Sequence, residues 1–373
     1  MMRRLLALLL VVTACSAPPP PRSAVTPSPP SPATLAAPTG DHPVGTTVLH
    51  LTDTSRPDPW NLDAKARELK VTLWYPGEPG AGARAAYMSP KESELVLRGS
   101  RAEGVPPDML SRTVVYATET APAPGRFPLV VLSPGFTKPV STLTSLAEDL
   151  ASRGYVVAGI DHTYESYATT LSDGRVTECL ACDSDTDPGF GTGVVQNRAA
   201  DVSFVLDELL SRRKEIDRTR IAMVGQSIGG ASALATMAAD RRVRAGVNLD
   251  GTTYARIPRD FARPFMFVGT PEHASGGRDN SWDRDWKLLT GGKRWLVVKG
   301  ADHQSFTDLP QLLGALGMKP LLGTPSAARL AEITRTYVAA FLDEHLKSRP
   351  QPLLKEASPS FPEIEFCPDA CGA

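Results

Sequence analysis

Residues 225–230, Gly-Gln-Ser-Ile-Gly-Gly, constrain the fold of this chain more than any other segment. An apolar run at 220–224 precedes them, and small helix-forming residues follow. A Gly-x-Ser-x-Gly sequence between a strand and a helix predicts a strained turn that presents the serine hydroxyl above the edge of a sheet. Gly225 and Gly229 leave room for the tight bend. The same letters can occur by chance in a loop, but the flanking patterns favour the turn at Ser227.

Apolar runs alternate with helical patterns along most of the chain, after two opening strands. Such alternation is typical of an α/β fold with a mostly parallel sheet and helices on both faces. The tail after Lys347 is rich in proline and is expected to be irregular. Strands are expected at 46–51, 69–74, 127–132, 155–160, 221–224, 243–249, 264–268 and 295–298, and helices at 141–152, 195–209 and 324–341.

The N-terminus has the pattern of an export signal. Arg3 and Arg4 precede an apolar stretch at 5–12 that is too short to span a bilayer. The following Val-Thr-Ala-Cys resembles a bacterial lipobox, which implies removal of residues 1–14 and acylation of Cys15. The expected location is the extracytoplasmic face of a membrane, with the lipid as anchor. The alternative is an ordinary secretory signal with Cys15 incidental.

Composition divides the rest of the chain into three parts. Residues 15–43 are rich in Pro, Ser, Ala and Thr and are expected to form a tether, because they cannot bury enough apolar surface to fold. Residues 44–346 form the expected catalytic domain, and 347–373 a cysteine-containing tail. The formal net charge of −1 gives no support for a nucleic-acid partner.

Four cysteines follow the expected lipidation site: Cys179, Cys182, Cys367 and Cys371. An even number in an exported chain favours disulfides, formed either within each close pair or between the two pairs. The same spacing could instead bind zinc, a weaker alternative in an exported protein. We therefore expect no metal at these cysteines. Chemistry at the Ser227 hydroxyl needs neither a metal nor an organic cofactor, and we expect none.

A serine hydroxyl needs a base to become a nucleophile, and histidine held by a carboxylate is the usual base. In folds with this turn, the order along the chain is serine, acid, histidine. His303 follows the last expected strand of the catalytic domain, which makes it the candidate base. His273 is its main competitor, and His162 would require a different order.

Asp250 ends a buried strand after the serine and is the candidate acid, with Glu272 as its rival. A buried carboxylate at that position is costly unless it is partnered. The tetrahedral intermediate also needs an oxyanion hole. We expect its donors to be the backbone N–H groups of Ile228, directly after the serine, and of Phe136, in the loop after the strand at 127–132.

Several segments together resemble the platelet-activating factor acetylhydrolase-like family of α/β-hydrolases, over roughly residues 44–346. The resemblance implies an α/β-hydrolase fold and a Ser-Asp-His triad with the acid soon after the turn, which supports Asp250 over Glu272. Gln226 and Pro134 depart from the family pattern and leave the acyl substrate open. The similar segments are 73–76, 128–136, 154–157, 225–230, 249–251 and 302–306.

The resemblance implies a serine esterase or lipase that acts on a small ester or lipid and forms an acyl-enzyme at Ser227. The alternatives are a cutinase-like polyester depolymerase, a peptidase or amidase, and a non-catalytic surface binding protein on a hydrolase scaffold. The polar excursion at 162–192 could be a lid or pocket wall, or simply a solvated loop. Trp282 and Trp286 could line a substrate entrance or pack a short helix.

Overall fold

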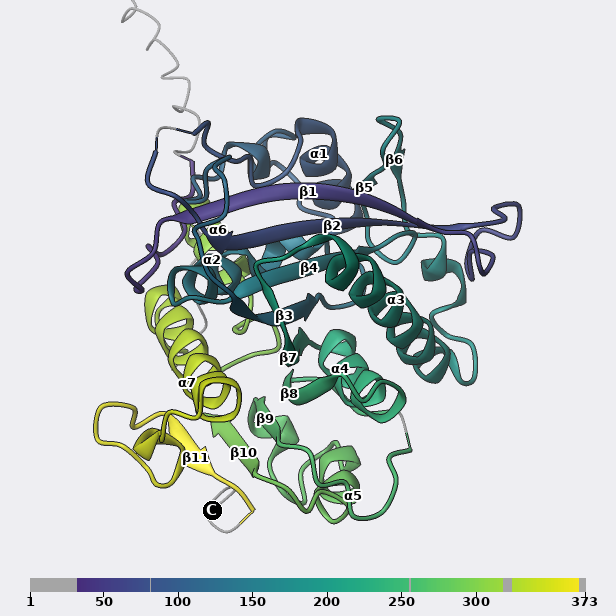
Figure 1. Ribbon diagram of the computed structural model, residues 1–373. Coiled ribbons are helices and arrows are strands. Elements are labelled where there is room, and N and C mark those ends of the chain that lie inside the picture. Colours follow the sequence, from purple (N-terminus) through teal and green to yellow (C-terminus); the bar gives the residue numbers. More distant parts are fainter. Residues whose placement is uncertain (1–31, 81, 255, 318–323, 369–373) are drawn as a thin grey trace, which may run out of the picture. The chain divides into compact units, whose positions relative to one another are not determined.

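A mixed sheet forms the centre of the protein in the computed structural model, which describes residues 32–80, 82–254, 256–317 and 324–368 (Figure 1). Within these ranges the sheet has nine strands, in the order β1-β2-β4-β3-β7-β8-β9-β10-β11. The six strands from β4 to β10 in this order are parallel, and β1, β2 and β11 are antiparallel to their neighbours. The strands are β1 (Val44–Asp53), β2 (Arg67–Pro76), β3 (Phe127–Ser133), β4 (Val156–His162), β7 (Ile216–Gln226), β8 (Val243–Leu249), β9 (Phe265–Gly269), β10 (Lys293–Val298) and β11 (Ile364–Phe366).

Helices cover both faces of this sheet, as Figure 1 shows. Alternate residues of β3 point to opposite sides: Val130 packs in the cluster that contains α2 and α7, and Val131 in the cluster that contains α3 and α4. Burial on both faces explains why the central strands read as continuous apolar runs. The helices are α1 (Pro90–Gly99), α2 (Thr144–Ser152), α3 (Phe190–Arg212), α4 (Ile228–Ala239), α5 (Ser281–Trp286), α6 (Leu309–Ala315) and α7 (Ala327–Lys347).

The predicted α/β architecture is confirmed, and each expected strand and helix appears with its ends within six residues of the expected bounds. The tail after Lys347 differs from the expectation. Its residues 364–366 form β11, which pairs antiparallel with β10 through Leu296 and Phe366. Proline content alone does not reveal this strand, because an edge strand needs hydrogen bonds on one side only.

The folded body also begins before residue 44, where the predicted tether ends. Leu35 is buried, and its N–H donates to the Val114 carbonyl at 3.1 Å. Arg335 of α7 donates to the carbonyls of Ala36 and Ala37. Residues 32–43 therefore pack on the domain through partners remote in sequence. The predicted signal peptide and Cys15 lie outside the described residues, and within the described ranges no helix is long and apolar enough to cross a bilayer.

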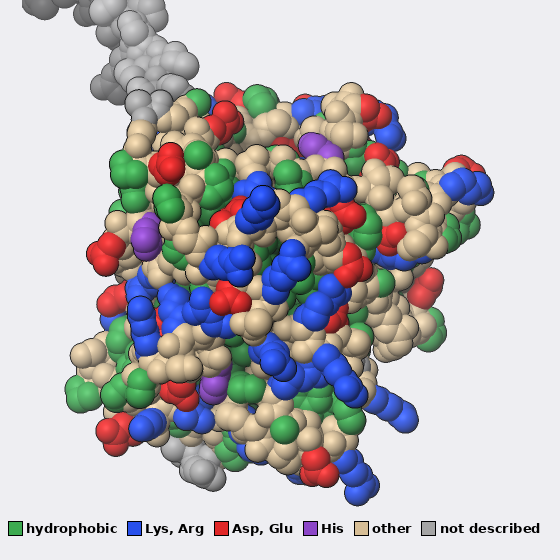
Figure 2. All heavy atoms as spheres, in the orientation of Figure 1, with side chains coloured by type: hydrophobic (Ala, Val, Ile, Leu, Met, Phe, Trp, Pro, Cys, Tyr) green, Lys and Arg blue, Asp and Glu red, His purple; other side chains and the backbone are tan. Residues whose placement is uncertain are grey.

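Basic side chains gather on the face seen in Figure 2, in front of α3, α4 and the start of β7. Many of these cations have a carboxylate partner within 3 Å, so much of their charge is offset locally. This is in line with the formal net charge of −1. The pairs are Arg212 with Glu208, Arg213 with Glu215, Arg220 with Asp217, and Arg242 with both Asp207 and Asp240.

Candidate active site

The predicted turn connects β7 to α4, with Ser227 between them. Ser227 has φ 55° and ψ −128°, a conformation that is rare and strained for a residue with a side chain. A Cβ atom on Gly225 would lie 2.1 Å from the backbone carbon of Gly229. A Cβ atom on Gly229 would lie 2.0 Å from the carbonyl oxygen of Ser133. The two glycines are therefore required by the close approach of three backbone segments.

Asp250 follows β8 and is buried beneath the turn. Its Oδ2 accepts a hydrogen bond from His303 Nδ1 at 2.6 Å. Its Oδ1 accepts from the backbone N–H of Thr270 at 2.7 Å. These bonds, together with one from His273, hold the pKa of Asp250 far below its usual range despite burial. The rival Glu272 is 68% exposed and pairs with Arg278 instead, so the structure joins His303 to Asp250.

His303 lies in the loop after β10, with its side chain 48% exposed. Its Nδ1 is held by Asp250, which leaves Nε2 as the nitrogen that can take a proton. Gln226 donates from its amide to the His303 carbonyl at 2.9 Å and fixes the loop. Ser227, Asp250 and His303 line one cavity of about 850 Å³. No hydrogen bond joins Ser227 to His303 in the described chain; such bonds often form only with substrate bound.

The two predicted oxyanion donors lie at the same cavity. Phe136 and Ile228 both line it, Phe136 from the loop after β3 and Ile228 from the first turn of α4. The first N–H groups of a helix have no acceptor within the helix. The structure gives neither of the two amides an acceptor among the described residues. Both are thus available to an oxygen atom placed above Ser227.

A buried ion-pair network lies behind the loop that follows β3. Arg198 of α3 is 1% exposed and donates from Nε to Glu165 at 2.7 Å and from Nη1 to the Ser133 hydroxyl at 3.0 Å. His162 lies 2.9 Å from the same hydroxyl through Nε2 and 2.7 Å from Asp201 through Nδ1. Charges at this depth are tolerated only when they are paired. The pairing ties the oxyanion loop to α3.

This network changes the interpretation of two residues. His162, a weak candidate base from sequence, does not line the cavity, and burial lowers its pKa. The sequence does not reveal the role of Arg198, because a single arginine within an apolar helical pattern matches no motif. A charged residue at an otherwise apolar position of a helix is the signal that could have found it.

His273, the competitor of His303, is a second partner of the same carboxylate. Its Nδ1 lies 2.9 Å from Asp250 Oδ1, and its Nε2 lies 3.1 Å from Asp279 Oδ2. Its ring stacks on Trp282 with 4.3 Å between centroids. Burial lowers the pKa of His273, but the two carboxylates outweigh it and raise the pKa to about 9. The imidazolium is therefore the stable form at neutral pH, which suits a supporting cation and not a base.

Aromatic side chains form one wall of the cavity. Phe136 and Phe190 meet edge to face, 5.1 Å apart, and Tyr254 lines the same space. Asp185, Phe190 and Gly191 also line the cavity. Residues near the end of the excursion at 162–192 therefore form part of its wall. Trp282 is buried in the core and does not line the cavity, which favours its packing interpretation.

The excursion contains a disulfide between Cys179 and Cys182, with an S–S distance of 2.03 Å. The bond uses both thiols that the zinc alternative would need at this pair. Cys367 is disulfide-bonded as well, whereas Cys371 lies outside the described residues. The prediction of disulfides is thus confirmed for Cys179 and Cys182, in the local pairing.

Comparisons with known proteins identify the family of this chain. Residues 34–180 and 174–351 match the family described as platelet-activating factor acetylhydrolase, isoform II. A probable 1-alkyl-2-acetylglycerophosphocholine esterase of Arthroderma benhamiae is 26% identical, over 92% of this chain and 96% of its own. A bis(hydroxyethyl) terephthalate hydrolase of Streptomyces coelicolor is 29% identical, over 42% of this chain and 43% of its own.

A solved structure of a ferulic acid esterase from Streptomyces cinnamoneus is 43% identical and has a TM-score of 0.83. It covers 91% of this chain and 100% of its own. The fold and the relatives define the protein as an α/β-hydrolase that cleaves carboxylic esters through a serine. Within that class, the chain belongs to the platelet-activating factor acetylhydrolase isoform II family.

The charged form of His273 makes a specific contribution to stability. Its pKa is about 9 in the folded protein, above the ordinary value of 6.5. The charged form therefore adds on the order of 3 kcal/mol to the free energy of unfolding. This contribution is complete below about pH 6.5 and is lost as the pH rises through about 9. Urea unfolding between pH 6.5 and 9 should show this loss in the wild type, and His273→Gln should remove most of it. His50→Gln, at an exposed position of β1, is the control; an unchanged pH slope in His273→Gln would contradict the assignment.

Proposed function

We propose that Ser227, His303 and Asp250 form the catalytic triad of this ester hydrolase. The Ser227 hydroxyl attacks the carbonyl carbon, and His303 Nε2 takes the hydroxyl proton. The N–H groups of Phe136 and Ile228 donate to the oxyanion of the tetrahedral intermediate. His303 then returns the proton to the leaving alcohol, which departs and leaves an acyl-enzyme. Water, deprotonated by His303, attacks this ester and releases the acid and Ser227.

The hydrogen bond between Asp250 and His303 is the main support for this proposal. Asp250 Oδ2 accepts from His303 Nδ1 at 2.6 Å, and both residues line the cavity that contains Ser227 on its positive-φ turn. A carboxylate in this position orients the ring and stabilises the imidazolium that forms when the proton moves. Nucleophile, base and acid in this arrangement account for the proton transfers of both half-reactions.

Esters of aromatic acids are the substrate class that we propose. The support is the aromatic wall of Phe136, Phe190 and Tyr254 beside Ser227. Two of the similar proteins are described as acting on such compounds, namely ferulic acid esters and bis(hydroxyethyl) terephthalate. A flat acyl group can pack its ring against these side chains, and aromatic pairs contribute about 0.5–1.5 kcal/mol beyond their buried area. Short acyl esters of the acetylglycerophosphocholine type are the second candidate, favoured by the family match.

Substitution of the proposed triad should abolish turnover. In Ser227→Ala and His303→Ala, kcat for p-nitrophenyl acetate should fall by about 10⁶-fold, and in Asp250→Asn by about 10⁴-fold. Glu272→Gln, which removes the rival carboxylate at an exposed position, should keep the wild-type rate. A Ser227→Ala protein that is folded by circular dichroism and retains full activity would overturn the triad.

The aromatic wall should determine acyl preference. We expect methyl ferulate to have a higher kcat/KM than methyl butyrate or 1-alkyl-2-acetylglycerophosphocholine. Phe190→Ala should lower kcat/KM for methyl ferulate about tenfold, corresponding to about 1.4 kcal/mol, with little change for methyl butyrate. Phe361→Ala, the same change outside the cavity, is the control. A preference for the acetylated phospholipid that Phe190→Ala leaves unchanged would favour the second candidate.

We also propose that the protein is exported and anchored through lipid on Cys15. The support is the basic residues Arg3 and Arg4, the short apolar stretch and the Val-Thr-Ala-Cys sequence. Two or more acyl chains on one residue are enough for stable anchoring. Radiolabelled palmitate should enter the wild-type protein in a bacterial host and place it in the membrane fraction. Cys15→Ser should lose the label and the membrane association; retention of both would contradict the proposal.

A further inference from the structure

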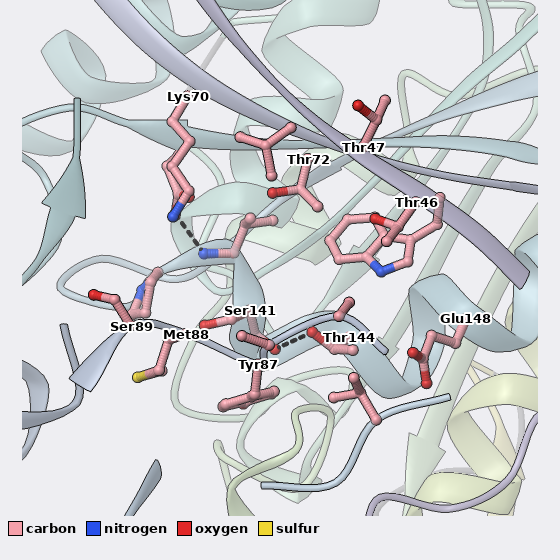
Figure 3. Close-up of a pocket in the computed structure, with 18 of the residues that line it drawn as sticks. Thr46, Thr47, Lys70, Thr72, Tyr87, Met88, Ser89, Ser141, Thr144 and Glu148 are labelled. Atoms are coloured by element: carbon pink, nitrogen blue, oxygen red, sulfur yellow. Dashed lines mark hydrogen bonds and ion pairs between the residues drawn. The ribbon is translucent and has the colours of Figure 1, made fainter. Parts of the chain in front are cut away.

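A second cavity, of about 620 Å³, lies on the α2 side of the sheet (Figure 3). Its walls come from β1 and β2, from the segment that leads into α1, and from the start of α2. It shares no lining residue with the cavity that contains Ser227. Its volume is in the range typical of sites for small organic ligands. The mechanism of ester hydrolysis makes no use of it.

Glu148 of α2 lies at one end of this cavity with its side chain fully buried. Its Oε1 accepts from the backbone N–H groups of Tyr116 and Ala117, at 2.8 and 2.6 Å. Its Oε2 has no hydrogen-bond partner among the described residues. Figure 3 shows the carboxyl group pointing toward the cavity. A buried carboxylate oxygen without a donor is costly, so a donor supplied by a ligand would be strongly favoured.

Two further lining groups lack partners in the same way. The hydroxyls of Thr120 and Ser141 are buried and make no hydrogen bond in the described chain, and both residues line the cavity. Unpartnered buried polar groups are rare in proteins. All three belong to residues that line this one cavity.

The charge around the cavity favours a cation. Lys70 is the basic residue of the lining, and it already pairs with Glu92 at 2.7 Å and Asp161 at 3.7 Å. Glu119 and Glu148 add two more carboxyl groups to the lining. The acidic groups thus outnumber the basic one, and an anionic ligand would meet an unfavourable field.

Two arginines outside the lining, Arg84 and Arg335, offset part of the charge of Glu148 and lower its pKa, but they form no hydrogen bond with its Oε2. Asp308, from the turn before α6, adds a further carboxyl group nearby, and burial raises the pKa of that group too. Burial is also the main cause that raises the pKa of Glu148 to about 7.

The remaining walls suit an organic group. Trp74 and Tyr87 line the cavity together with apolar side chains such as Val48 and Met88. Aromatic faces attract cations by about 0.5–2 kcal/mol and pack against apolar parts of the same ligand. A metal ion is disfavoured, since no cluster of three metal-ligating side chains occurs in the described chain.

We propose that this cavity binds a small organic ammonium ion whose nitrogen donates to Glu148 Oε2 and whose apolar part packs against Trp74 and Tyr87. The ligand supplies both the missing donor and the missing positive charge. This site is independent of the proposed triad and does not depend on the ester substrate.

Calorimetric titration of the full-length protein with benzylamine tests the proposal, with benzyl alcohol as its neutral counterpart. At pH 8 the amine should bind at least tenfold more tightly than the alcohol. Because the pKa of Glu148 is about 7, the amine should bind about a hundredfold more weakly at pH 5 than at pH 8. Equal affinity for amine and alcohol, or no binding of the amine at millimolar concentration, would overturn the proposal.

Two variants localise the binding. Glu148→Gln keeps an oxygen for the Tyr116 and Ala117 amides but loses the charge, and it should weaken benzylamine binding at least tenfold. Ala86→Trp, at an exposed position of the lining, should block the cavity without affecting the core. Glu94→Gln removes an exposed carboxylate outside the cavity and should bind as the wild type does. Unchanged affinity in both Glu148→Gln and Ala86→Trp would assign the amine to another place and refute the site.

Discussion

The close approach of backbone segments around Ser227 is the constraint on which the active site depends. Strands β3, β7 and β8 are parallel and end at one edge of the sheet, so the segments that follow them meet there. A Cβ atom on Gly251 would lie 1.9 Å from the carbonyl oxygen of Ser227, and one on Gly229 would lie 2.0 Å from that of Ser133. The segments of nucleophile, acid and oxyanion donor are thus in direct backbone contact. Their relative positions are set by the sheet and the glycines, and side-chain flexibility plays little part.

Asp250 is held in place by hydrogen bonds to one of its oxygens and keeps the other oxygen for His303. Thr270 N–H and His273 occupy Oδ1, which leaves Oδ2 to a single partner, His303. The charge of His273 offsets the cost of burying the carboxylate, and Asp279 in turn balances His273. The acid is therefore fixed from its buried side, while the histidine that it orients stays exposed to substrate. This asymmetry separates His303, the candidate base, from its competitor His273.

The sequence predicted the parts of the protein that depend on local patterns. The turn at Ser227 and the central strands follow from glycine spacing and from apolar runs buried on two faces. The sequence could not show that Ala36 and Ala37 bind Arg335 of α7, since composition predicts disorder and Arg335 is remote in sequence. Nor could it show the pairing of Arg198 with Glu165 or the unpartnered oxygen of Glu148, because both depend on which distant groups meet in the core.

One short segment of chain contributes residues to both cavities. Phe136 lines the cavity of Ser227, and Pro139 and Val140 line the cavity of Glu148. Between them, the N–H of Thr137 donates to the Glu165 carbonyl at 2.9 Å, and the N–H of Val140 donates to Asp161 at 2.7 Å. Both acceptors belong to β4 or to the turn after it, so the segment is attached to the sheet on either side of Lys138. A ligand beside Val140 would therefore meet a fixed wall, and the oxyanion donor would keep its position whether that cavity is filled or empty.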